Sequence, residues 1–247
     1  MDKNAIKTAA EILRDSGHIA VLTGAGISAE SGVPTFRGEH GLWKQFRAEE
    51  LATPEAFARD PKLVWEWYDW RRGIIAKVEP SRGHWTLAKW EEIFPEFTLI
   101  TQNVDGLHAK AGSKNILELH GNIWKVRCTK EEAVTENYAV PLNEIPPACP
   151  VCGAMLRPHV VWFGESLDAD LLGRAFGLSA SCDVMLVIGT SAFVQPAASL
   201  PLRAAENGAK IIEINPAPTP LTSYADISLL GKAGEVLPAI DGLLQKE

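Results

Sequence analysis

Three polar side chains near the middle of the chain could bind a ligand, and one of them, a histidine, could transfer a proton. His120 follows Ile116–Leu119, a short apolar run that predicts a strand. The carboxyl end of a strand is where open α/β sheets bind ligands, and a histidine there titrates near neutral pH. Asn103 and Asp105 follow another such run, and their amide and carboxylate groups can donate and accept hydrogen bonds to a ligand. These residues alone leave open a structural histidine and an ordinary Asn-Val-Asp turn.

A glycine-rich loop near the N-terminus predicts a nucleotide site. Thr23–Ser28 (TGAGIS) directly follows an apolar run and precedes a predicted helix. Glycines let a backbone approach phosphates, which the N–H groups of a helix N-terminus can bind. The third glycine of the GxGxxG pattern is displaced to Gly32 and Gly38, so a tight turn is the alternative. The long polar continuation over 30–38 favours the nucleotide site.

The elements that must position these residues alternate between strands and helices. Five β-branched runs predict strands: His18–Thr23, Phe97–Thr101, Ile116–Leu119, Val184–Gly189 and Lys210–Asn215. Several are apolar almost throughout, as in parallel strands covered on both faces, and helical patterns such as Gln195–Asn207 lie between them. We expect an α/β fold, a doubly wound parallel-sheet, Rossmann-like domain over 1–38, 96–123 and 159–247. We expect 39–95, a helical insertion, and 124–158, a cysteine module, to form a smaller domain.

The composition argues against several classes of protein. No apolar run approaches the roughly 20 residues that a membrane span needs. The net charge of −7 argues against nucleic-acid binding, which favours a basic face. Met1–Asn4 leads into an amphipathic helical pattern without the apolar core of a signal peptide, so we expect a cytoplasmic protein. The sequence specifies no oligomeric state and is compatible with a monomer.

Six motifs in the chain resemble the sirtuins, the NAD-dependent protein lysine deacylases. They are GAGISAESGVPTFRG (24–38), TQNVDGLH (101–108), LHG (119–121), RPHVVWFGE (157–165), GTS (189–191) and EIN (213–215). The match spans the chain in the family's order. It implies that NAD is a co-substrate and that the products are nicotinamide, O-acyl-ADP-ribose and bare lysine. The alternatives are an NAD-dependent ADP-ribosyltransferase, a non-catalytic binding module and a hydride-transferring dehydrogenase.

The resemblance assigns roles to individual residues. It implies that His120 is the general base, that Asn103 and Asp105 line the nicotinamide pocket, and that Gln102 contacts a ribose. Phe36 would shield the reactive carbon from water. The implied NAD-binding set is Gly24, Ala25, Gly26, Ser28, Phe36, Arg37, Gln102, Asn103, Asp105, Gly189, Thr190, Ser191 and Asn215, with Asn103 also catalytic.

Two further segments predict how an acyl-lysine protein or peptide is bound. Val161, Trp162, Phe163 and Gly164 resemble the segment that pairs with a substrate peptide as an added strand; a buried apolar strand is the alternative. Tyr68 and Arg71 are three residues apart on one face of a predicted helix and could share a carboxylate. With Ala52, they resemble the sirtuin class that removes succinyl and malonyl groups. The alternative is a packing tyrosine beside a surface arginine.

Three cysteines predict a metal site that departs from the family pattern. Cys128, Cys149 and Cys152 cluster in sequence, and Cys182 is expected to pack as a small apolar residue. Sirtuins typically hold a structural zinc on four cysteines, but Glu131 stands where the fourth is expected. Glu131 could supply an oxygen ligand, the site could bind zinc weakly, or the module could fold without metal. We expect weakened or absent zinc.

Overall fold

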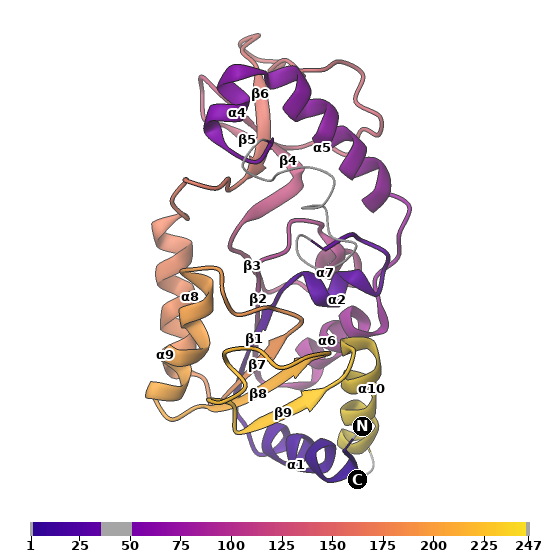
Figure 1. Ribbon diagram of the computed structural model, residues 1–247, viewed down its shortest axis with the longest axis vertical. Coiled ribbons are helices and arrows are strands. Elements are labelled where there is room, and N and C mark those ends of the chain that lie inside the picture. The colour runs from indigo at the N-terminus through magenta and orange to yellow at the C-terminus, as the bar shows by residue number, and fades with distance from the viewer. Residues whose placement is uncertain (1, 36–50, 246–247) are drawn as a thin grey trace.

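A parallel sheet of six strands forms the centre of the larger domain (Figure 1). The computed structural model describes residues 2–35 and 51–245. The strands, in spatial order, are β3 (Ile116–Glu118), β2 (Glu96–Thr101), β1 (His18–Thr23), β7 (Val184–Ile188), β8 (Lys210–Asn215) and β9 (Ile227–Leu230). The chain winds outward from β1 in one direction, then returns to β7 and winds outward in the other. The doubly wound fold predicted from the sequence is therefore confirmed, and β9 is an additional strand.

Alternate residues of the strands pack on opposite layers of helices. Ile19 and Val21 of β1 face one hydrophobic cluster, whereas Ala20 and Leu22 face another. The helices on the first face are α1 (Lys3–Arg14), α6 (Arg82–Ile93) and α10 (Ala233–Leu244), and those on the second are α8 (Ala169–Ser181) and α9 (Leu200–Glu206), preceded by the short η2 (Ala197–Ser199). No helix of the described residues is long and apolar enough to cross a membrane.

A smaller assembly lies beyond one end of the sheet, at the top of Figure 1. It combines an antiparallel sheet with two helices that come from a distant part of the sequence. Its elements are β4 (Gly121–Cys128), β5 (Val134–Glu136), β6 (Leu156–Val160), α4 (Pro54–Arg59) and α5 (Pro61–Ile75). Asp60 caps α5 by accepting a hydrogen bond from Leu63 N–H, and Pro61 begins the helix. Trp65 and Tyr68 of α5 share a buried core with Leu156.

Helix α6 joins the larger core rather than the smaller one. It falls within the segment 39–95 that we expected in the smaller domain. However, Leu87 and Trp90 are buried in the first cluster of the parallel sheet, and α6 packs on α10. The apolar face of α6 can be buried only there, so we propose that the helical part of the smaller domain ends before Arg82.

Candidate active site

The loops after β1 and β7 meet at the point where the strand order reverses, which is where doubly wound sheets bind ligands. Gly24 N–H donates to Ile188 O at 3.0 Å, and Gly26 N–H donates to Gly189 O at 2.8 Å. A Cβ atom on Gly26 would lie 2.6 Å from Gly189 Cα. Gly189 itself has a φ of +61°. The two loops therefore pack backbone against backbone, which requires glycine on both sides.

Polar side chains after β2 tie these two loops to a third. Gln102 Nε2 donates to Thr190 Oγ1 at 3.1 Å. Asn103 Nδ2 donates to Gly24 O at 2.9 Å and to Ser28 Oγ at 3.1 Å. Gly24 directly precedes the short helix α2 (Ala25–Ala29), and Ser28 lies within it. Residues from three separate motifs thus form one polar rim at the carboxyl ends of β1, β2 and β7.

The His120 side chain is held with one ring nitrogen bonded. Its Nδ1 lies 2.9 Å from Gln102 O, and because a carbonyl only accepts, Nδ1 carries the proton. Nε2 then bears the lone pair. Burial lowers the pKa of His120, while the Gln102 carbonyl partly opposes this shift. The ring is therefore neutral at neutral pH and can accept a proton at Nε2.

Asp105 lies buried beside the positive charge of Arg71. Burial raises the pKa of Asp105, and the hydrogen bond from Leu107 N–H, that from Ser28 and the charge of Arg71 oppose the rise. Strand β4 of the smaller sheet also holds the backbone of this turn, because Trp124 Nε1 donates to Asp105 O at 2.8 Å. The turn that carries Asp105 is thus held by both domains.

A buried hydrogen-bonded group beneath the rim was not predicted from the sequence. Thr23 Oγ1 donates to Thr101 Oγ1 at 2.8 Å and lies 2.9 Å from His108 Nε2. The His108 ring lies 4.7 Å from that of His84. Burial lowers the pKa of His84 to about 4 and that of His108 well below its usual value, so both rings are neutral. His108 stands in a recognised motif, but its partners come from distant segments.

Tyr68 and Arg71 are both buried, so Arg71 is not a surface residue. Tyr68 Oη accepts a hydrogen bond from Trp162 Nε1 at 2.9 Å. The Arg71 guanidinium lies 4.9 Å from the Trp67 ring centre. Arg71 also lines a small pocket, together with Val33, Pro34 and Ile75. The predicted pair therefore lies inside the protein, near the same buried turn as Asp105.

The segment that follows β6 bridges His120, beside the polar rim, and the segment before helix α4. Val161 N–H donates to His120 O and Phe163 N–H to Ala52 O, both at 2.9 Å. Trp162 N–H donates to the Glu165 carboxylate at 2.8 Å. The segment is therefore not a regular strand, and a peptide added beside it would depend mainly on its carbonyl groups.

The remaining predicted residues lie at the rim or outside the described residues. Ala25 opens α2, Ser191 follows Thr190, and Gly164 forms a turn at φ +87°. Asn215 ends β8, and its Nδ2 donates to Ala217 O at 3.1 Å. Phe36 and Arg37 lie outside the described residues.

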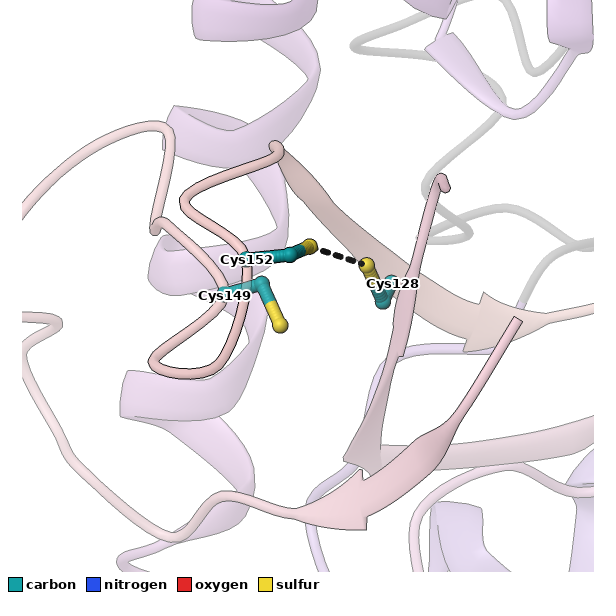
Figure 2. A group of neighbouring side chains, drawn as sticks. All are labelled: Cys128, Cys149 and Cys152. Atoms are coloured by element: carbon teal, nitrogen blue, oxygen red, sulfur yellow. Dashed lines mark hydrogen bonds between the residues drawn. The ribbon is translucent and has the colours of Figure 1, made fainter. Parts of the chain in front are cut away.

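The three clustered cysteines lie close together, and the sulfur atoms of Cys128 and Cys152 face each other (Figure 2). Their sulfur atoms all lie within 4.8 Å of one another, and Cys128 Sγ is 3.5 Å from Cys152 Sγ. Thiolates on a tetrahedral zinc, with Zn–S bonds of about 2.3 Å, are about 3.8 Å apart, so the three donors fit. Glu131 instead directs its backbone N–H at Cys128 Sγ, while its carboxylate pairs with Lys130 at 3.5 Å. Within residues 2–35 and 51–245, the ligand cluster holds only the three thiols.

We expect purified protein to contain less than one equivalent of zinc by elemental analysis, because three thiolates leave a tetrahedral site open. Glu131→Cys should raise the zinc content and slow zinc loss to a chelator, whereas Lys130→Cys serves as the control for an added thiol. One tightly held equivalent in the unaltered protein would contradict this expectation.

Comparisons with known proteins agree with this geometry. A model of the Sir2 family matches residues 24–196. An NAD-dependent protein deacylase of Aquifex aeolicus (strain VF5) is 59% identical over 230 residues, which cover 93% of this chain and 96% of that protein. A crystal structure of a Sir2 homologue in complex with NAD has a TM-score of 0.89 and 50% identity, covering 98% of this chain and 94% of that chain. A Sir2 mutant with a deacetylated p53 peptide and 3′-O-acetyl ADP ribose has a TM-score of 0.86 and 33% identity, covering 96% and 97%.

Proposed function

This chain belongs to the Sir2 family, and from that premise we propose that it is a deacylase that prefers lysine side chains carrying acidic acyl groups, succinyl and malonyl. The coarser activity, NAD-dependent protein deacylation, is that of its family. Acetyl-lysine is a poorer substrate in this proposal. The products are nicotinamide, O-acyl-ADP-ribose and free lysine.

The buried Tyr68–Arg71 pair is the observation that carries this proposal. Burying a hydroxyl and a guanidinium costs free energy unless both groups are hydrogen-bonded, and an uncharged acetyl group offers no carboxylate to pair with them. A carboxylate can accept hydrogen bonds from both groups. Burial raises the pKa of Tyr68, so its hydroxyl keeps the proton that it would donate. Ala52, also buried, leaves room for the longer acyl chain.

The polar rim is proposed to hold NAD, which supplies an activated ribose carbon when nicotinamide leaves. Gly24, Gly26 and Gly189 give the backbone-lined surface that a pyrophosphate can approach. Gln102 and Asn103 lie beside it, where they can bond to the ribose and the carboxamide. His120 accepts the proton of a ribose hydroxyl at Nε2, and Gln102 O holds the ring in the tautomer that this step requires.

The position of His120 predicts a pH dependence. The base must be neutral to act, so activity falls as the pH drops through its pKa. Because burial lowers that pKa, we expect the acidic limb of kcat/KM to have its midpoint below 6.5. The measurement is kcat/KM for an acyl-lysine peptide at saturating NAD from pH 5 upward. A midpoint above 6.5 would contradict the assigned environment of His120.

The experiment that tests the function incubates the protein with NAD and peptides that differ only in carrying acetyl-, succinyl- or malonyl-lysine. Mass spectrometry should show free lysine with succinyl- or malonyl-ADP-ribose, at higher kcat/KM than for the acetyl peptide. Faster removal of acetyl would overturn the acyl preference alone. ADP-ribose transferred to protein, with the acyl group left on lysine, would indicate an ADP-ribosyltransferase instead.

A further inference from the structure

We propose that Trp162 sets the direction in which Tyr68 donates its proton, and is therefore a positioning residue for the choice of acyl group. This inference rests on the proposed function. Trp162 Nε1 donates to Tyr68 Oη at 2.9 Å, although the two residues are 94 positions apart in the sequence. The contact joins the segment after β6 to helix α5, so it ties the two parts of the predicted substrate site together.

The direction follows from the donors and acceptors involved. An indole N–H can only donate, so Tyr68 Oη must be the acceptor in this bond. A phenolic O–H prefers one of two directions in the plane of its ring. With one side taken by the indole, the O–H points to the other side. Tyr68 is therefore arranged as a donor before any ligand arrives, which reduces the ordering cost of binding a carboxylate.

The indole that imposes this direction is itself held firmly. The Arg157 guanidinium lies 3.6 Å from the centre of the Trp162 ring. Arg157 is fixed by two hydrogen bonds to the Glu165 carboxylate, at 2.6 and 2.9 Å. The same carboxylate accepts Trp162 N–H at 2.8 Å. Both the backbone and the ring of Trp162 are thus anchored by one ion pair, so the indole N–H has little freedom to turn away from Tyr68.

The positive charge of Arg71 lies on the same helix face, close enough to oppose the effect of burial on Tyr68. A carboxylate that accepts a hydrogen bond from the Tyr68 hydroxyl would also be attracted by the positive charge of Arg71. An acetyl group offers no carboxylate, so it gains nothing from the direction of the hydroxyl. Loss of the indole N–H should therefore weaken the binding of acidic acyl groups and leave acetyl binding nearly unchanged.

The test compares kcat and KM for succinyl- and acetyl-lysine forms of one peptide across a mutant cycle. Trp162→Phe should raise KM for the succinyl peptide roughly three- to tenfold, with kcat and the acetyl constants changing much less. In a Tyr68→Phe background the same change should have no further effect on the succinyl-to-acetyl ratio. Trp65→Phe is the matched control, because the Trp65 ring also packs on Tyr68, with 6.5 Å between the ring centres, but its indole N–H donates to Leu156 O and not to Tyr68.

A benzothienylalanine at position 162 keeps a fused ring of similar size and replaces the indole N–H with a sulfur atom that cannot donate a hydrogen bond, so it serves if Trp162→Phe is poorly folded. Equal losses on both peptides, or a loss that persists without the Tyr68 hydroxyl, would overturn the role of Trp162. If the unaltered protein shows no preference for the succinyl peptide, the proposed function fails. If that preference is present and falls in Tyr68→Phe but not when the indole N–H is removed, only this inference fails.

Discussion

Replacing His120 with alanine is expected to lower deacylation by roughly 10²- to 10⁴-fold, the contribution typical of a positioned general base. The fold should persist, because within the part of the chain that the structure describes the ring bonds to Gln102 O alone, at the carboxyl end of the sheet. NAD affinity should also persist, since the glycine loops after β1 and β7 are held by backbone contacts that do not involve His120. The measurements are turnover of an acyl-lysine peptide and NAD binding by calorimetry.

The matched control for this variant is His18→Gln. His18 lies at the opposite end of β1, where it contacts Ser181 O and Glu96. Loss of that imidazole should leave turnover nearly unchanged. Near-normal turnover in His120→Ala would show that another group accepts the proton. A loss of NAD binding equal to the loss of turnover would show that His120 acts in binding instead.

Replacing Arg71 with methionine should lower kcat/KM for desuccinylation far more than for deacetylation. A hydrogen bond to a charged group contributes about 1.5–3 kcal/mol, which corresponds to roughly ten- to a hundredfold. Methionine keeps much of the apolar volume and removes the charge. The measurement is kcat/KM for both acyl forms of one peptide.

Arg59→Met removes an exposed arginine from the neighbouring helix α4 and serves as the control for a general loss of charge. Arg71→Lys should retain part of the preference, because it keeps the charge without the planar fork. Equal losses on both peptides in Arg71→Met would refute the carboxylate pocket, since an acetyl group has no carboxylate to lose.

The features that local sequence pattern determines could be predicted. Five strands of the parallel sheet follow from apolar runs, and the glycines of 24–26 stand where β1 ends. Short β9 was not predicted, because Ile227–Leu230 is brief and only partly buried. The packing of α6 on the larger core could not be predicted either. Its apolar face is visible in the sequence, but nothing local indicates that α10 covers it.

The residues proposed for the site come from single motifs, whereas the contacts between distant segments could not be predicted from the sequence. His120 and Asn103 stand in motifs that the family resemblance identifies. The partners of His108, and the bond between Trp162 and Tyr68, depend on how elements pack, so no spacing in the chain indicates them.

The most direct test of the acidic acyl pocket is a crystal structure of the protein with a succinyl-lysine peptide. We predict that the succinyl carboxylate lies within about 3.2 Å of Tyr68 Oη and of the Arg71 guanidinium nitrogens. The Trp162 indole should still donate to Tyr68 in that complex. A succinyl carboxylate that points into solvent, with Arg71 turned elsewhere, would contradict the account.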